Sequence, residues 1–437
     1  MKLPALLAIA AALWTAPAVA ELSSPEKRMV ASIDRELDRH VGLLERLVNQ
    51  NSGTLNRPGV EAVGRMMRAE LEPLGFKVEW VPLPETGRAG HLIATHKGNG
   101  RGKRMLLIGH LDTVFEPDSP FQRFTGKGDV AEGPGVGDDK GGMVVMVAAL
   151  RAMQAAGTLK QADIEIVLTG DEEDAGLPIE AARRRLIEAG KRADVALDFE
   201  GLAQEQGRDM GSIARRSSAN WEVRASGRSG HSSSIFREGV SNGAIYELAR
   251  IIAAFRTELP EPNLTFNVGL VAGGDTATLD SGKTRAAASG KTNISPQVAL
   301  ARGDIRTLTR EQDERVRTRM REIVARHLPG TGAEISFDPK FYPPMAPTEG
   351  SRALLGRLNQ VNRDMGLPEM GELDPLRRGA GDIGFVAADV DGLVGLGTAG
   401  EGAHAPGETV ELPSIARQAK RAAILMSRLA REKRTKR

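Results

Sequence analysis

Three apolar segments of this chain end in acidic residues, and this pattern restricts the possible fold more than any other feature. The segments are RMLLIGHLDT at 104–113, ADIEIVLTGDEED at 162–174 and ADVALDFEG at 193–201. Helical apolar patterns separate them, so strands alternate with helices, which indicates a largely parallel sheet. Ligands of such sheets bind beyond the carboxyl ends of the strands. The acids are therefore expected to meet at one edge of the sheet.

A different pattern occupies residues 213–340. It indicates a strand, a helix, two strands, a helix and a strand, the order of a small α+β domain of the split-βαβ, ferredoxin-like type. After residue 340 the first pattern returns, with a helix, a strand and a final helix. We therefore expect an α/β domain, formed by 21–212 plus 341–437, with a mixed, mostly parallel sheet flanked by helices. Residues 213–340 are expected to be inserted into it.

The first twenty residues differ from the rest and predict a signal peptide. Met1 and Lys2 form a short positive start, an apolar run follows, and Ala18-Val19-Ala20 fits the small-residue rule for cleavage. The apolar run is too short to span a bilayer as a helix. We expect cleavage after Ala20 and export to the periplasm or the medium.

The composition argues against several classes of partner and site. The 59 Lys and Arg residues nearly balance the 57 Asp and Glu residues, and aromatic residues make up only 4% of the chain. Neither nucleic acid nor a membrane surface is therefore an expected partner. Because the chain has no cysteine, a metal site must use His, Asp and Glu, which excludes zinc fingers and iron–sulfur clusters.

A glycine-rich stretch, GPGVGDDKGG at 133–142, contains two adjacent aspartates. Paired carboxylates would repel phosphate, and the phosphate-binding Walker pattern fails because Lys140 is followed by Gly141 rather than Ser or Thr. Glycines let the backbone approach a site closely. One of the aspartates can cap the helix that follows, and Asp138 is the candidate to bridge two metal ions.

Two histidines and several acids are the candidate metal ligands. His110 and Asp112 share one face where a strand ends, so Asp112 is placed to accept the second N–H of a metal-bound His110. His404 lies in the glycine-rich loop GTAGEGAHAPGE. The four acids of TGDEED would repel one another in a single cleft unless a cation offset them. Without thiols, these residues suit two zinc-like ions that share a carboxylate.

The order and spacing of six motifs resemble the dizinc exopeptidase family. The motifs are GHLDT, GPGVGDDKGG, TGDEE, DFE, SGHSS and GAHAPGE. This family includes glutamate carboxypeptidase, succinyl-diaminopimelate desuccinylase, peptidase T and the aminoacylases, and the likeness is greatest to its exported glutamate carboxypeptidases. It extends from near residue 25 to the final helix. It implies a catalytic domain of 21–212 plus 341–437, a lid and dimerisation domain at 213–340, and a homodimer.

The resemblance also implies a set of metal ligands. Two Zn²⁺ ions would be bound, with Co²⁺ or Mn²⁺ as substitutes in vitro. One ion would be held by His110 and Glu200 and the other by Glu173 and His404, with Asp138 as the bridge.

Further roles follow from the same resemblance. Asp112 would orient a metal-bound histidine, and Glu172 would be the general base. His231, in SGHSS, would reach the active site of the partner subunit. The peptide bond between Asp138 and Asp139 would be cis.

Asn293 and Arg306 match family positions that face the substrate, and Lys340 or Arg378 is the candidate to bind a terminal carboxylate. Glutamate-specific members carry an arginine just before a proline where the chain returns to the catalytic domain, and Tyr342 stands there instead. We expect hydrolysis of the amide bond next to a C-terminal amino acid in a small peptide or N-acyl amino acid, with glutamate preference left open. An N-acyl amino acid amidohydrolase or a dipeptidase is the alternative, and an inactive exported binding protein is a remote one.

Overall fold

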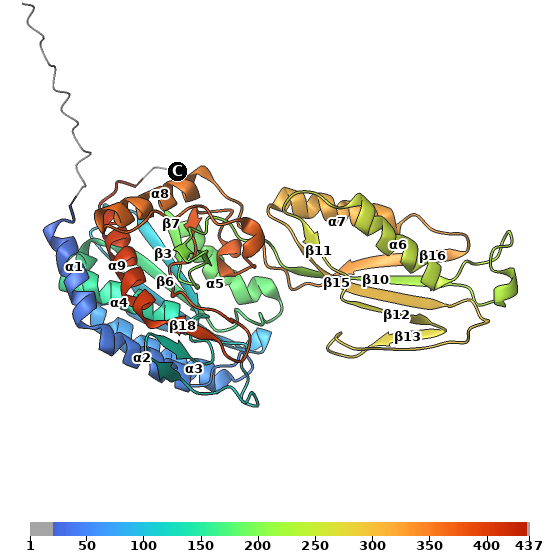
Figure 1. The fold of residues 1–437 in the computed structure, drawn as a ribbon, viewed down its shortest axis with the longest axis horizontal. Coiled ribbons are helices and arrows are strands. Elements are labelled where there is room, and N and C mark those ends of the chain that lie inside the picture. Colours follow the sequence, from blue (N-terminus) through green and yellow to red (C-terminus); the bar gives the residue numbers. More distant parts are fainter. Residues whose placement is uncertain (1–20, 435–437) are drawn as a thin grey trace, which may run out of the picture.

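The computed structural model describes residues 21–434, and in it the chain forms two bodies joined by a narrow neck (Figure 1). The predicted signal peptide, residues 1–20, lies outside the described residues. The larger body contains both the first and the last described helix, and the smaller one projects from it as an elongated insert. Within the described part of the chain, no helix combines the length and the hydropathy needed to cross a lipid bilayer.

A mixed six-stranded sheet forms the centre of the larger body. Its strands lie in the order β1-β2-β6-β3-β7-β17, and the last four of these run parallel. The strands are β1 (Lys77–Leu83), β2 (Arg88–His96), β6 (Asp163–Thr169), β3 (Arg104–His110), β7 (Val195–Asp198) and β17 (Gly392–Leu393). The predicted α/β fold with a mostly parallel sheet is confirmed. The predicted last strand is confined to two residues.

Helices cover both faces of this sheet, because successive residues of its strands point to opposite sides. In β3, Met105 and Leu107 join the core under α4, whereas Leu106 and Ile108 join the core under α5. The central helix α4 packs against α1, α2 and α9 and is buried almost all round. The helices are α1 (Ser24–Arg35), α2 (Leu37–Asn49), α3 (Arg57–Leu71), α4 (Lys140–Ala155), α5 (Ile179–Arg192), α8 (Glu349–Asp364) and α9 (Leu412–Leu429).

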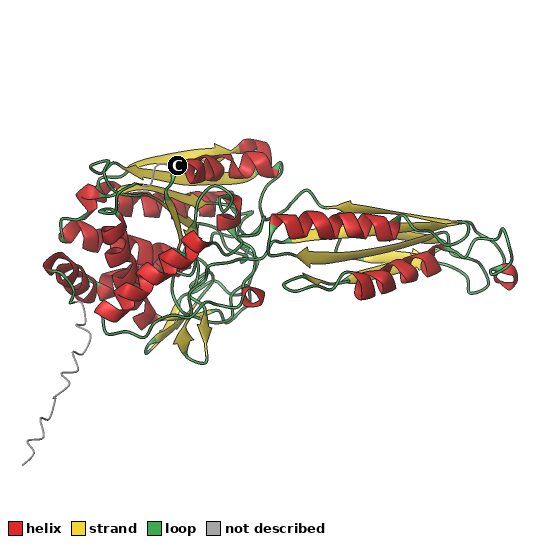
Figure 2. Ribbon diagram, turned by 90° about the horizontal axis from the view of Figure 1, so that it is seen from above, coloured by secondary structure: helices red, strands yellow, loops and turns green. Residues whose placement is uncertain are grey.

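The insert is a five-stranded antiparallel sheet with two helices on it. Its elements are β10 (Ala219–Gly227), α6 (Ala244–Glu258), β11 (Thr265–Phe266), β12 (Leu270–Gly274), β15 (Val298–Arg306), α7 (Arg310–Val324) and β16 (Thr331–Phe337). Both helices run along the length of the strands (Figure 2). They cover a separate core in which Trp221 meets Phe255 edge-on at 5.5 Å. A hairpin that the sequence did not predict, β13 (Thr276–Leu279) with β14 (Ala286–Ser289), adds to this body.

The neck consists of two chain segments that pair with each other. Arg215 and Met345 exchange two backbone hydrogen bonds of 2.9 Å, and Ser218 and Tyr342 exchange two of 3.0 Å. Ser218 immediately precedes β10, the first strand of the insert. The two bodies are therefore joined by a short antiparallel ladder rather than by single flexible strands.

Two small sheets complete the larger body. One pairs β4 (Thr125–Lys127) with β5 (Val130–Glu132) and β5 with β18 (Thr409–Glu411); the other pairs β8 (Gln204–Glu205) with β9 (Arg208–Asp209). The β18–β5 pairing matters for the site, because it places the loop before β18 beside the glycine-rich stretch that follows β5.

Candidate metal centre

The parallel strands bring the sequence-predicted residues to one edge of the sheet. His110, the last residue of β3, pairs with Thr169, the last residue of β6, and β7 ends beside them at Asp198. The residues that follow these strands therefore leave the sheet at the same edge. They include Asp112 after β3, Glu172 and Glu173 after β6, and Glu200 after β7.

Asp138 lies between the two candidate histidines. His110 Nε2 lies 2.9 Å from Asp138 Oδ1, and His404 Nε2 lies 3.1 Å from Asp138 Oδ2. The two oxygens of one carboxylate thus face different imidazoles, which is the arrangement that a carboxylate bridging two metal ions requires. His404 Nε2 also lies 3.0 Å from Glu173 Oε2. Single ligand atoms of His110, Asp138 and Glu173 all lie within 4.8 Å of one another.

Glu200, the fifth predicted ligand, has a different partner. Its carboxylate pairs with the buried guanidinium of Arg215, which comes from the neck. Glu200 nevertheless lines the same cavity of about 350 Å³ as Asp138, Glu172 and Glu173. Direct contacts therefore link four of the predicted ligands, and the fifth faces the cavity while held by an arginine.

The glycine-rich stretch fits tightly against the end of β7. A Cβ atom at Gly142 would lie 1.9 Å from the carbonyl oxygen of Phe199, so only glycine allows this approach. The peptide bond between Asp138 and Asp139 is cis, as predicted. Asp139 precedes α4 at the cap position, but its side chain makes no capping bond; instead it accepts a 3.2 Å hydrogen bond from the backbone N–H of His110.

The electrostatics of the site favour a cation. Burial raises the pKa of Glu173 to about 7, and burial together with nearby Glu200 raises the pKa of Glu172 well above its usual range. Hydrogen bonds to Asp138 and Glu173 raise the pKa of His404 to about 11. Several carboxylates thus share one poorly solvated space, where ionisation is costly without positive charge. Metal ions would displace the protons that these groups hold, so the residues present fit a metal site.

Asp112 holds the backbone of the site in place through hydrogen bonds. Its Oδ1 accepts a 3.0 Å hydrogen bond from the backbone N–H of Glu172, and its Oδ2 accepts one of 3.1 Å from that of Glu173. His110 Nδ1 lies 3.1 Å from the backbone oxygen of Asp112 and 3.4 Å from its Oδ1. Asp112 therefore orients both the histidine and the loop that carries the two glutamates, and the second role was not predicted.

Glu408 is a supporting residue that the sequence reasoning missed. Its Oε1 accepts hydrogen bonds from the backbone N–H groups of Gly137 at 2.8 Å and Asp138 at 3.0 Å, and its Oε2 accepts one from Gly135 at 3.0 Å. Glu408 is the last residue of the GAHAPGE motif, so the sequence analysis already contained it. The motif did not predict the β18–β5 pairing, which brings Glu408 next to the loop that carries Asp138.

The residues predicted to face the substrate fall into two groups. Arg306 and Arg378 line the cavity of the metal centre. Lys340 lies outside the set of residues that line it, and its ammonium group pairs with Asp174. Asn293 lies in the insert, where its backbone oxygen accepts a 2.9 Å hydrogen bond from the N–H of Ser232.

His231 also lies at the far end of the insert. The loop that follows β10 stands at the end of the insert away from the larger body, drawn in yellow-green in Figure 1. The nine residues of β10, at about 3.3 Å each, separate it from the neck by roughly 30 Å. His231 is exposed, and its Nδ1 lies 2.9 Å from Ser233 Oγ. The structure does not bring His231 or Asn293 to the metal centre of the same chain.

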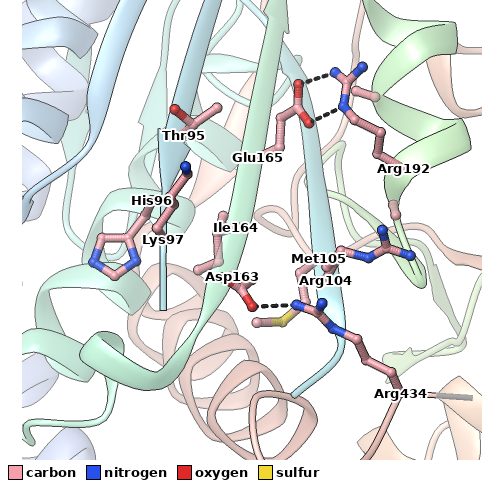
Figure 3. A pocket seen from close by; sticks show the side chains of 12 residues that line it. Thr95, His96, Lys97, Arg104, Met105, Asp163, Ile164, Glu165, Arg192 and Arg434 are labelled. Atoms are coloured by element: carbon pink, nitrogen blue, oxygen red, sulfur yellow. Dashed lines mark hydrogen bonds and ion pairs between the residues drawn. The ribbon is translucent and has the colours of Figure 1, made fainter. Parts of the chain in front are cut away.

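A second cavity, of about 250 Å³, lies at the opposite edge of the sheet (Figure 3). Arg104 and Asp163, the first residues of β3 and β6, line it. Both acids that line it are paired: Glu165 with Arg192 at 2.6 Å and Asp163 with Arg434 at 2.5 Å. This cavity has no cluster of unneutralised acids and lies away from the strand ends that carry the predicted ligands.

Comparison with known proteins identifies the family. Residues 106–428 match the model of peptidase family M20/M25/M40. The chain is 27% identical to carboxypeptidase G2 of Pseudomonas sp. (strain RS-16) over 96% of each chain. It is 30% identical to a succinyl-diaminopimelate desuccinylase of Novosphingobium aromaticivorans, over 68% of this chain and 76% of that one. The fold resembles that of the aminopeptidase PepT of Bacillus cereus, with a TM-score of 0.71, 19% identity, and coverage of 90% of this chain and 99% of that one. The resemblance seen in the motifs is confirmed: the chain belongs to peptidase family M20/M25/M40 and is a metallopeptidase or amidohydrolase.

Proposed function

We propose that the chain is a dizinc exopeptidase that hydrolyses the amide bond next to the C-terminal amino acid of a small peptide. The observation that carries this proposal is the placement of Asp138 between His110 and His404, with Glu173 in contact and Glu172 beside them. Glu200 would complete the ligand set by exchanging its arginine partner for a metal ion. Zinc is proposed because histidine and carboxylate ligands suit it.

Bound there, the metal pair would supply an acidified water molecule and polarise the scissile carbonyl. Glu172 carries the proton transfers. Its carboxylate would accept a proton from the attacking water and then donate it to the amine nitrogen as the C–N bond breaks. Asp112 fixes the backbone of Glu172 by accepting a hydrogen bond from its N–H group. A carboxyl group whose pKa is raised by burial suits both steps, because it binds a proton more firmly than a solvated carboxylate does and can release it again.

Arginines on the cavity wall favour a substrate with a free carboxylate. Arg306 and Arg378 both line the cavity, and Arg378 Nε is buried without a hydrogen-bond partner. A guanidinium group binds a carboxylate in a bidentate fashion, so Arg378 is the proposed anchor for the substrate terminus. Lys340 is the weaker candidate, because Asp174 already neutralises it.

The position of His231 supports a homodimer formed through the insert. About 30 Å of strand separates the loop of His231 from the neck. If the insert keeps this shape, His231 cannot reach the site of its own chain and can act only at the site of another subunit. In the proposed dimer, His231 would stabilise the oxyanion in the partner's cavity, with Asn293 beside it. We also propose export to the periplasm or the medium, on the basis of residues 1–20.

The substitution Glu172→Gln tests the proposed mechanism. Glutamine keeps the size of the side chain and the backbone contacts but cannot accept the proton. We expect kcat to fall by about 10²–10⁴-fold, while metal content, measured by plasma mass spectrometry, stays at the wild-type value. Full activity in this variant would refute the assignment of Glu172 as the base.

An N-acyl amino acid amidohydrolase or a dipeptidase remains the second candidate, because the same centre would cleave either amide. The candidates are distinguished by kcat/KM values measured on a panel of substrates. The panel contains dipeptides, acyl-peptides and N-acyl amino acids with glutamate, lysine or leucine at the C-terminus. Preference for N-acyl amino acids over peptides would favour the amidohydrolase. No turnover of any member with the metal-loaded protein would contradict the enzyme mechanism and favour a binding protein.

A further inference from the structure

One side chain of the neck reaches the loop that carries the proposed base. The hydroxyl of Tyr342 donates a hydrogen bond to the backbone oxygen of Glu172, and it accepts one of 3.2 Å from Arg183 Nη2. The ring packs edge-on against Phe385 at 5.4 Å and lies beside the guanidinium of Arg183. Burial raises the pKa of Tyr342 well above its usual range, so the phenol keeps the proton that it donates.

Two of the contacts that hold the loop around Glu172 come from within the larger body. Asp112 accepts the backbone N–H groups of Glu172 and Glu173. Arg183, fully buried in α5, donates to Asp171 Oδ1 at 2.6 Å and to the Asp171 backbone oxygen at 2.9 Å. These anchors stay in place if the insert moves. The Tyr342 anchor differs from them because it lies in the neck: its ring packs against the core of the larger body, whereas its backbone pairs with Ser218, next to the first strand of the insert.

We propose that Tyr342 is a positioning residue for Glu172 and couples the base to the neck of the insert. The proposal rests on the proposed function of Glu172. Because the backbone of Tyr342 belongs to the ladder of the neck and its hydroxyl holds the carbonyl of Glu172, one residue links this ladder to the residue that carries the proposed base. Arg215, on the same ladder, contacts Glu200, so the ladder touches the site at two points.

The same contacts bear on specificity. Tyr342 stands where glutamate-specific relatives are expected to carry an arginine, and its hydroxyl is already engaged by Glu172 and Arg183. A neutral phenol with both contacts made has no free charge to offer a substrate carboxylate. At this position the chain therefore carries a side chain that contacts the loop of the proposed base and offers no charge that would select a substrate carboxylate.

The substitution Tyr342→Phe tests the proposal kinetically. Phenylalanine keeps the packing against Phe385 and removes only the hydroxyl, with its hydrogen bonds to Glu172 and Arg183. A hydrogen bond of about 1–2 kcal/mol corresponds to a fall in kcat of about 5- to 30-fold, with KM within about twofold and metal content unchanged. Tyr246→Phe is the matched control, because Tyr246 is the other tyrosine of the chain and is 52% exposed on α6. Equal kcat values for wild type and Tyr342→Phe would overturn the proposal.

A spectroscopic readout separates this proposal from the proposed function. The chain has two tyrosines, so replacement of both by 3-fluorotyrosine gives two ¹⁹F resonances, and Tyr342→Phe assigns them. We expect Zn²⁺ alone to shift the Tyr342 resonance, since the ion would bind Glu173 next to Glu172, and to leave the Tyr246 resonance in place. A Tyr342 resonance unmoved by saturating Zn²⁺ would refute the coupling even in an active enzyme. A shift in a protein that hydrolyses no member of the substrate panel would support the coupling and refute the proposed function instead.

Discussion

The substitution Glu408→Gln tests how Asp138, the aspartate proposed to bridge the metal ions, is held. Glu408 is buried and is not a proposed ligand, yet its carboxylate receives three backbone N–H groups from the loop that carries Asp138. Glutamine preserves the shape of the side chain. Its amide oxygen can still accept from Gly137 and Asp138, but its NH₂ group then faces the N–H of Gly135, and two donors cannot bond to each other.

The cost follows from these contacts. One charge-assisted hydrogen bond is lost, the two that remain accept at a neutral oxygen, and one buried N–H is left without a partner. Burial also raises the pKa of Glu408 to about 7, so removing its charge recovers part of the loss. We expect the loop to lose about 2–3 kcal/mol of local stability, which corresponds to a fall in amide protection of about 30- to 150-fold.

Hydrogen exchange measured by mass spectrometry on peptides covering 133–142 gives this value directly. The weaker loop should also raise the dissociation constant for Zn²⁺, measured by competition with a chelator, because Asp138 would no longer be held in place. Glu401→Gln is the matched control, since Glu401 is an exposed acid seven residues earlier in the same loop. Wild-type exchange in peptides 133–142 of Glu408→Gln would refute the structural role given to Glu408.

Three further predictions concern the metal centre and the insert. Glu173→Gln should lower the bound zinc per subunit, measured by mass spectrometry, in contrast to Glu172→Gln. The folded-state pKa of Glu173 is raised from 4.5 to about 7, so its contribution to the stability of the metal-free protein is present below pH 4.5 and is lost as pH rises through 7. The difference in Tm between metal-loaded and metal-free protein should therefore widen over this pH range. A constant difference in Tm would contradict the pKa shift. His231→Ala should lower kcat without changing zinc content, and mixing it with Glu172→Gln should restore part of the activity if the sites are shared between subunits.

The shared edge at which His110, Glu173 and Glu200 emerge was predictable from strand geometry, whereas their proposed roles as ligands came from the resemblance. Parallel strands of one sheet end at the same edge, so acids that follow His110, Thr169 and Asp198 had to emerge together. The cis bond after Asp138 also followed from the resemblance. The general plan of the fold was predictable for the same reason, since strands and helices of different period alternate along the chain.

The supporting contacts were not predictable, because they join residues far apart in sequence through side chains. Glu408 reaches Gly135 across 273 positions and Tyr342 reaches Glu172 across 170. No periodic pattern marks such pairs. Arg215 likewise looked like an ordinary basic residue near a domain boundary, and only the ladder of the neck directs it to Glu200.

Anomalous X-ray scattering from crystals of the zinc-loaded protein, measured on both sides of the zinc edge, tests the central claim most directly. We predict two peaks about 3.5–4 Å apart, with one oxygen of Asp138 on each, His110 and Glu200 on one ion, and Glu173 and His404 on the other. Glu200 should then have left Arg215. A single peak, or peaks away from Asp138, would contradict the account.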